Sequence, residues 1–137
     1  MTKIGELELL NIIYGNIVTT FDIAEEYGDT LPSWVSVVSV KDIYRQQLLK
    51  MQIDKGESSA IALALETPES TIILDDYKAR KIAHNLGINI TGTIGIIVKA
   101  KLNGVIPSIK PMLQKIKETN FRLSTELELL ALKEAKE

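Results

Sequence analysis

The stretch from Thr71 to Asp76 places the strongest constraint on how this 137-residue chain can fold. It reads TIILDD, a continuous run of β-branched and apolar residues that ends in two carboxylates. Such a run is typical of an interior parallel strand, because a strand of that kind is covered on both faces. Helical patterns stand on either side of it, at 56–65 and after Asp76. Strands that alternate with helices predict an α/β fold with a mostly parallel sheet.

The same alternation extends over the rest of the chain. Strands are predicted at 16–20, 34–40, 71–74 and 88–90, and helices at 3–14, 21–28, 41–53, from Asp54, after Asp76, at 96–104, from Pro107 to about Asn120, and at 124–137. The length suits one domain that spans residues 1–137. Its last segment, 124–137, is predicted to be an amphipathic helix behind a Ser/Thr cap.

Composition narrows the classes of function. Sixteen basic residues against 18 acidic ones give no overall electrostatic reason to expect nucleic acid, so any such binding would be local. The absence of cysteine excludes disulfides, thiolate metal sites and thiol nucleophiles. The longest uncharged apolar stretch, about 87–98, is too short and too rich in glycine for a membrane span. These features predict a cytoplasmic protein that does not enter a membrane.

Acidic residues fall where predicted strands end or predicted helices begin. Glu25 and Glu26 lie in the 21–28 turns, Glu57 opens the helix after Asp54, and Asp75 and Asp76 follow a strand. Open α/β sheets place their sites at this edge. Two ionised carboxylates about 4 Å apart repel by roughly 4 kcal/mol at an effective dielectric of about 20, and Mg²⁺ or Mn²⁺ relieves that repulsion. A carboxylate-held cation of this type supports hydrolysis of a phosphodiester.

Each acid also has a purely structural explanation. Asp54 and Glu57 have the spacing of a capping box. One of Asp75 and Asp76 suits the N-cap of the next helix. The acids of the 21–28 segment fit a solvated helix face. Both explanations remain open at this point.

Two further features have alternative roles. Arg80 lies one helical turn after Asp76, so it is placed either to pair with that carboxylate or to reach a substrate phosphate. The TGTIG segment (91–95) offers backbone N–H groups to an anion, but close packing of a strand and a helix needs the same glycines.

Three motifs taken together resemble one known family. GESSAIALAL (56–65), LDDYKARKIAHNLGINITGTIGIIVKAKLNG (74–104) and FRLSTEL (121–127) are similar to the PIN-domain superfamily, in its VapC-like branch of small toxin-like proteins. The resemblance covers essentially the whole chain. It implies a three-layer α/β/α sandwich and cleavage of RNA that depends on a divalent metal, Mg²⁺ or Mn²⁺. Relatives of this kind often act as the toxin of a toxin–antitoxin pair, so an antitoxin-like partner and a homodimer are expected.

The resemblance also assigns the acids. PIN domains gather carboxylates from four places, and the second corresponds to Glu26, with Glu25 as the alternative. The third corresponds to Glu57. The fourth corresponds to Asp75 or Asp76, and the register stays open.

The first acidic place has no counterpart in this sequence. PIN domains begin with a central apolar strand that ends in Asp, whereas this chain begins MTKIGELELL, which resembles the helix that follows that strand. Either the true start lies upstream, or the leading strand has been lost. Loss of that strand would leave unpaired edges inside the sheet and favour strand exchange or dimerisation, with the C-terminal segment as a contact surface.

Two functions follow from the resemblance. The first is a toxin-type ribonuclease in which Glu26, Glu57 and the Asp75/Asp76 pair hold the cation, while Arg80 and Lys78 steer the substrate phosphate. The second is a catalytically inactive PIN-like binding module that contacts an antitoxin-like partner or another copy of itself.

Overall fold

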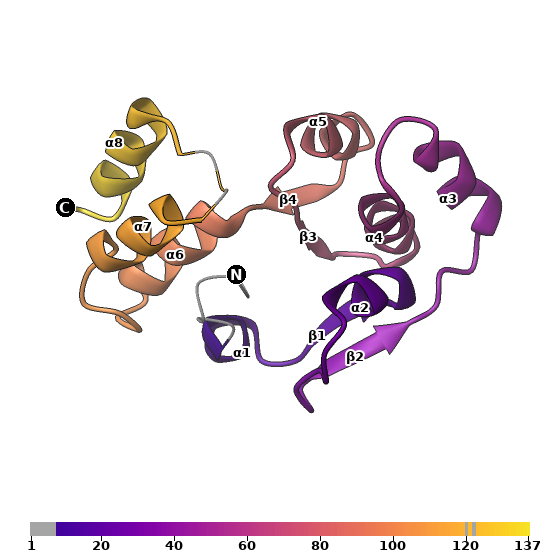
Figure 1. The fold of residues 1–137 in the computed structure, drawn as a ribbon, viewed down its shortest axis with the longest axis horizontal. Helices are drawn as coiled ribbons and strands as arrows, with labels where there is room; N and C mark the ends of the chain where they lie inside the picture. The colour runs from indigo at the N-terminus through magenta and orange to yellow at the C-terminus, as the bar shows by residue number, and fades with distance from the viewer. Residues whose placement is uncertain (1–7, 120, 122) are drawn as a thin grey trace. The chain divides into compact units, whose positions relative to one another are not determined.

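The computed structural model describes residues 8–119, 121 and 123–137. These residues form two compact units (Figure 1). The sheet unit runs from Asn16 to Gly92, and the helical unit comprises the described residues before and after that range. Each unit has its own hydrophobic core.

The described elements alternate as the sequence predicts. Their bounds are α1 (Glu8–Tyr14), β1 (Ile17–Thr20), α2 (Phe21–Tyr27), β2 (Val35–Val38), α3 (Ile43–Lys50), α4 (Lys55–Glu66), β3 (Thr71–Ile73), α5 (Tyr77–Asn85), β4 (Asn89–Thr91), α6 (Thr93–Leu102), α7 (Lys110–Lys117) and α8 (Thr125–Glu134). No described helix reaches the length and hydropathy that crossing a bilayer would require.

Side-chain caps fix where most of these helices begin. In each case a side-chain oxygen accepts a hydrogen bond from a backbone N–H three residues later. These caps are Thr20 for α2, Asp42 for α3, Asp54 for α4, Asp76 for α5 and Ser124 for α8. Three of these five helix starts therefore depend on an aspartate. Asp76 is itself a predicted site residue, and Asp54 lies three residues before Glu57.

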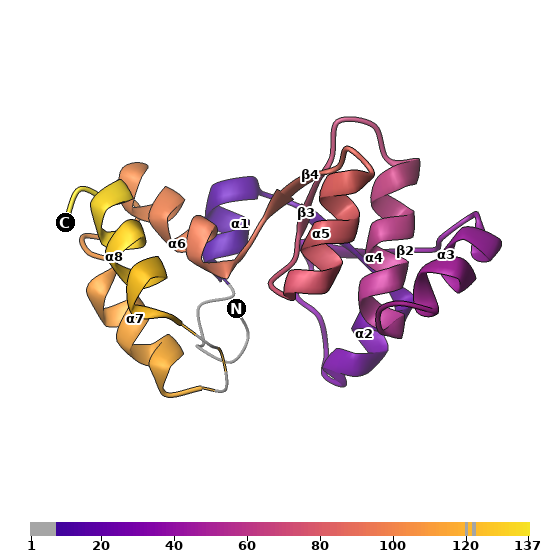
Figure 2. The same ribbon diagram turned by 90° about the horizontal axis from the view of Figure 1, so that it is seen from above.

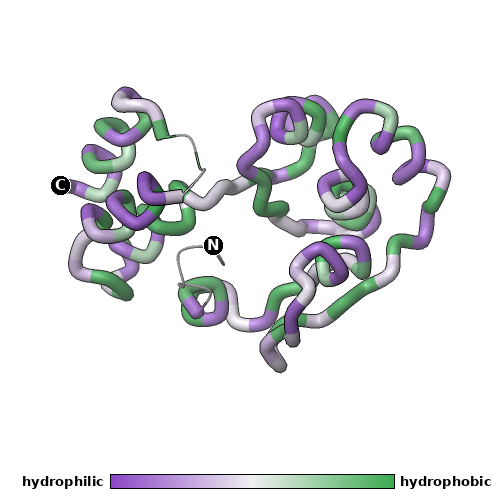
Figure 3. Tube along the Cα trace, in the orientation of Figure 1, coloured by the Kyte–Doolittle hydropathy of each residue, from purple (hydrophilic) through white to green (hydrophobic). Residues whose placement is uncertain are grey.

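The sheet unit contains two parallel pairs of strands. In one pair β1 lies beside β2, with Ile17 opposite Val35, and in the other β3 lies beside β4, with Thr71 opposite Asn89. The pairs are separate sheets, and α4 contacts both β1 and β3. In Figure 3 the β2 segment is coloured green for its hydrophobic residues.

In each two-stranded pair, the outer edge of both strands has no paired strand in the described part of the chain. In a parallel ladder, alternate residues direct their peptide groups to opposite sides. The Ile17 N–H donates to the Trp34 carbonyl at 3.0 Å, and the Leu74 N–H donates to the Thr91 carbonyl at 2.9 Å. The peptide groups of Val18 in β1 and of Ile73 in β3 therefore face away from the paired strand.

The core of the sheet unit lies between the strands and α4 and α5. Ile61 and Ala62 from α4, Ala79 and Ala83 from α5, and Ile72 from β3 are all buried in it. Figure 2 shows α4 and α5 side by side, in agreement with their contacts. The small alanines allow this close approach of the two helices.

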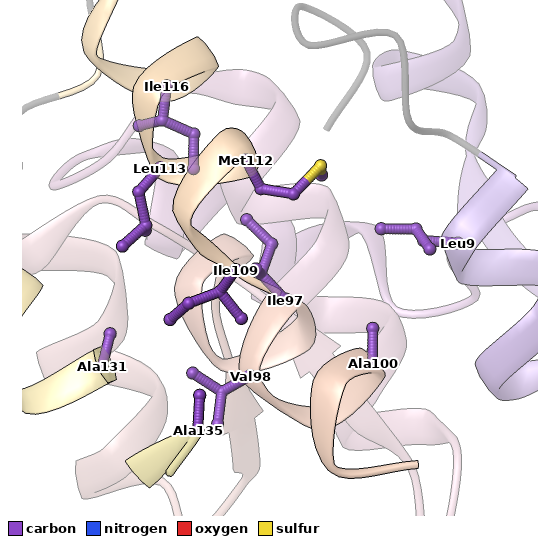
Figure 4. Close-up of a cluster of buried hydrophobic side chains, with 10 residues drawn as sticks. All are labelled: Leu9, Ile97, Val98, Ala100, Ile109, Met112, Leu113, Ile116, Ala131 and Ala135. Carbon is purple, nitrogen blue, oxygen red and sulfur yellow. The ribbon is translucent and has the colours of Figure 1, made fainter. Parts of the chain in front are cut away.

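The helical unit is held by aliphatic side chains from α1, α6, α7 and α8. Figure 4 shows Leu9 from α1 directed toward this cluster, which includes Ile97, Ile109 and Leu113. At the C-terminus, Lys101 Nζ donates to the Ala135 carbonyl at 2.9 Å, which joins α6 to the end of α8.

The α/β class and the parallel strands are confirmed. The strands form two parallel pairs instead of one continuous sheet. The helix expected at 3–14 is described from Glu8 to Tyr14, since residues 3–7 lie outside the described part of the chain. The helix expected from Pro107 is shorter, because it starts only at Lys110, after an N-cap position, Ile109, that has no capping side chain.

Candidate metal centre

A buried hydroxyl relay holds α2 against the first turns of α4. Ser59 Oγ donates to the Gly56 carbonyl at 2.7 Å, and since a hydroxyl has one proton, the 2.6 Å bond between Thr20 Oγ1 and Ser59 Oγ is donated by Thr20. Thr20 Oγ1 also accepts from the Ile23 N–H at 3.2 Å, which begins α2. The end of β1, the start of α2 and the start of α4 are therefore fixed together.

This arrangement brings Glu26 onto the face of α4. A Cβ atom at Gly56 would stand 2.7 Å from Oε1 and 2.8 Å from Oε2 of Glu26. Any residue with a side chain at this position would displace the carboxylate. Glycine at 56 thus makes room for Glu26, and although Glu25 and Glu26 are both exposed, only Glu26 lies beside Gly56 in this way.

Glu57 is the acid of this group whose pKa is raised by its surroundings. It is half-buried in the first turn of α4, and the Asp54 side chain accepts from its backbone N–H at 2.9 Å. Burial raises the pKa of Glu57 from 4.5 to about 7, with further contributions from the charges of Asp54 and Asp76, a side-chain hydrogen bond with Asp54 and the charge of Glu26. Carboxylates from three separate segments therefore act on one carboxyl group.

The two consecutive aspartates after β3 have different surroundings. Asp76 Oδ2 accepts from the Ala79 N–H at 3.0 Å and caps α5, and Asp76 is the one whose charge acts on Glu57. Asp75 Oδ1 lies instead beside Gly92, where an added Cβ atom would stand 2.9 Å from it. Asp76 thus belongs to the Glu57 group.

The basic side chains near these acids also differ in their surroundings. Arg80 Nη1 donates to the Leu74 carbonyl at 2.9 Å, next to Asp75. Lys78 is exposed in the first turn of α5. Lys55 in α4 pairs with Asp22 of α2 at 3.3 Å, which gives it a structural role.

Several members of this site were not predicted from the sequence. Gly56 and Gly92 make room for charged side chains, and Thr20 and Ser59 join their segments. The available signals were weak, because a glycine before an acid in GES and a glycine in TGT are common patterns. Asp54 was predicted as a helix cap, and its effect on Glu57 was not.

A comparison with protein-family models identifies the family of this chain. The family model DUF3368, described as a PIN domain, matches residues 1–137. The chain belongs to the PIN-domain family. No curated protein and no solved structure matches the chain. PIN domains generally use divalent metals, so the candidate residues of this PIN domain can be tested against such an ion.

The donor atoms fit a hard divalent cation by their chemistry. Glu26, Glu57 and Asp76 offer carboxylate oxygens, the ligands that Mg²⁺ and Mn²⁺ prefer. As placed in the described part of the chain, no three acidic or histidine side chains are close enough together to hold one ion. Burial first, and then the neighbouring carboxylates, raise the pKa of Glu57, because each nearby negative charge disfavours its ionisation. A divalent ion would lower that electrostatic energy.

Proposed function

We propose that this PIN domain is a toxin-type ribonuclease that depends on Mg²⁺ or Mn²⁺ and hydrolyses RNA phosphodiesters, with residues 1–137 acting as one domain. The observation that supports it best is the raised pKa of Glu57, caused by burial and by Asp54, Asp76 and Glu26. Capping α4 and α5 needs one acid each, whereas this group has four acids. Acids that disfavour each other's ionisation are typical of functional sites.

Glu26, Glu57 and Asp76 would hold the ion, with Asp54 and Asp75 adding negative charge from the same edge. When bound, the ion polarises a phosphodiester oxygen and lowers the pKa of a water molecule. The residues themselves orient the ion, since Gly56 supports the Glu26 carboxylate and the cap to Ala79 fixes one oxygen of Asp76.

We assign the substrate phosphate to Lys78. Its side chain is exposed at the start of α5, directly after Asp76, and a helix start favours an anion. Arg80 was the other candidate, but one of its donors is already used by the Leu74 carbonyl. A flexible, exposed ammonium group suits a phosphate that moves as the bond breaks.

The setting that we propose is cytoplasmic, with an antitoxin-like protein as regulator and a homodimer as the assembled form. These proposals rest on membership of the PIN family and on the resemblance to its toxin-like branch.

The direct test uses purified protein and single-stranded RNA. We expect cleavage with Mn²⁺, loss of cleavage in EDTA, and at least a hundredfold lower rate for Glu57→Gln with unchanged circular dichroism. Glu126→Gln is the matched control, since Glu126 also lies in a first helical turn, behind the Ser124 cap of α8. If Glu57→Gln cleaves RNA at the normal rate, Glu57 has no part in the reaction.

A second pair of variants tests the choice between neighbouring acids. Glu26→Gln should weaken Mn²⁺ binding about tenfold in calorimetry, because it removes one charged ligand. Glu25→Gln changes net charge equally on the same helix and should have little effect. The reverse result would move the second acidic place from Glu26 to Glu25.

The alternative function is a catalytically inactive binding module, and one surface favours it. Tyr44, Leu48 and Met51 follow each other at helical spacing along α3 and its C-cap, and they are 80%, 66% and 81% exposed. Exposed apolar stripes mark contact surfaces. For this alternative, calorimetry should show no divalent-ion binding tighter than millimolar, and Leu48→Ser should abolish self-association in light scattering.

A further inference from the structure

The Arg80 guanidinium lies where β3 turns into α5. The backbone N–H of Arg80 donates to the Asp76 carbonyl at 2.9 Å. The Arg80 side chain extends toward β3, where Nη1 donates to the Leu74 carbonyl, also at 2.9 Å. Arg80 therefore spans the whole turn that contains Asp75 and Asp76. Lysine lacks the planar fork that lets a guanidinium serve two acceptors at once.

Gly92 forms the surface on which this arginine lies. A Cβ atom there would stand 2.5 Å from Arg80 Nη1, 2.9 Å from Asp75 Oδ1 and 3.2 Å from the Leu74 carbonyl oxygen. Gly92 is buried and is not among the glycines with a left-handed φ. The residue is thus glycine because of space, and not because of backbone conformation. The Arg80 and Asp75 side chains therefore both lie against Gly92.

Asp76, the residue after Asp75, makes different contacts. Asp76 bonds to the Ala79 N–H and acts on Glu57, whereas Asp75 lies on the Gly92 side with Arg80. The conformation of this turn therefore decides where both carboxylates lie.

We propose that Arg80 is a positioning residue: packed on Gly92 and bonded to the Leu74 carbonyl, it fixes the turn so that Asp75 stays beside it and Asp76 stays bonded to the Ala79 N–H as the cap of α5. This inference rests on the proposed function for its consequence, the assembly of the cation site. It does not need Arg80 to contact the ion or the RNA.

Mn²⁺ calorimetry separates positioning from simple electrostatics, because the two effects have opposite signs. Arg80→Met removes a positive charge near a cation site, so electrostatics alone would tighten Mn²⁺ binding. Positioning instead predicts about tenfold weaker binding, as expected when a group that orients a ligand is lost. Arg80→Lys keeps the charge and should weaken binding nearly as much. Arg45→Met, on α3, is the matched control and should leave Mn²⁺ affinity unchanged. Tighter binding by Arg80→Met, or normal binding by Arg80→Lys, would overturn the proposal.

A measurement without metal tests the same contact independently. In EDTA, Arg80→Met and Gly92→Ala should each lower the melting temperature, and the double variant should lower it no further than the more severe single variant, since both changes release the same guanidinium. Additive shifts would overturn the proposal. If the wild-type protein binds no Mn²⁺, the proposed function fails, and the melting temperatures still decide whether Arg80 and Gly92 act as one unit.

Discussion

The carboxylate of Glu26 lies directly against Gly56, at the point where any other residue would place its Cβ atom. The two residues come from α2 and α4, and the Thr20–Ser59 hydrogen bond joins these helices beneath the contact. The glycine therefore makes room for the Glu26 carboxylate at the start of α4.

Gly56→Ala should separate binding from stability. The three atoms nearest to the added methyl group all belong to the flexible end of the Glu26 side chain, and alanine is favoured over glycine inside a helix by up to about 1 kcal/mol. We expect a melting temperature equal to or above that of the wild type, with Mn²⁺ affinity reduced about tenfold. Calorimetry and thermal unfolding on the same sample measure both quantities. Unchanged affinity would show that Glu26 has no need of this position.

Glu57 should make the metal-free protein less stable as the pH rises. Its pKa is about 7 in the folded protein and about 4.5 when unfolded, so the folded state binds more protons between these values and the free energy of unfolding falls as pH increases through them. Because Glu57 is only half-buried, solvent screening reduces the effect to about 1 kcal/mol. Denaturation in EDTA at pH 5 and pH 8 measures it.

Glu57→Gln is the comparison for that measurement. The amide does not ionise, so this variant should lack the pH-dependent loss and be more stable than the wild type at pH 8. Adding Mn²⁺ at pH 8 should stabilise the wild type and have little effect on the variant. Equal pH slopes for the two proteins would contradict the assigned pKa of Glu57.

Glu66 should act in the opposite direction. Its carboxylate at the end of α4 accepts bonds from the Lys41 and Asp42 N–H groups, the shorter ones at 2.9 and 2.8 Å, just before α3. These bonds, first that of Asp42, lower the pKa of Glu66. The stability they provide is present above the unfolded pKa and is lost as pH falls through the lowered folded value.

Glu66→Gln should therefore reduce the free energy of unfolding at pH 7 by about 1 kcal/mol, less than the roughly 1.5–3 kcal/mol of a hydrogen bond to a charged group, because solvent screens this carboxylate and the amide oxygen still accepts. The difference from the wild type should shrink as pH falls below 4, where the wild-type carboxylate becomes protonated. Glu69→Gln, an exposed acid three residues later, is the control. A difference that is constant from pH 7 to pH 3 would show that the charge of Glu66 has no role.

The sequence predicted those features that depend on local pattern. Three residues of the strand predicted at 71–74 formed β3 (Thr71–Ile73). The predicted capping position of Asp54 was confirmed, and one of the two aspartates at 75–76 was found to cap α5. The orientation of Asp75 relative to Asp76 was not predictable, because it depends on Arg80 and on Gly92, which is 16 positions further along the chain than Asp76. Nor does the sequence show that the Glu26 carboxylate occupies the space that a side chain at position 56 would need. Such contacts form only when distant segments meet.

The division of the strands into two pairs should be visible in amide hydrogen exchange. Val18 and Ile73 direct their N–H groups to the open edges, whereas the Ile17 and Leu74 N–H groups are hydrogen-bonded to the neighbouring strand or its flank. An amide at an open edge exchanges through small local openings, so its protection is low even where its side chain is packed. In the metal-free protein we expect Val18 and Ile73 to exchange at least about tenfold faster than Ile17 and Leu74. Equal protection at all four positions would mean that another strand covers these edges in solution, and that the two pairs belong to one continuous sheet.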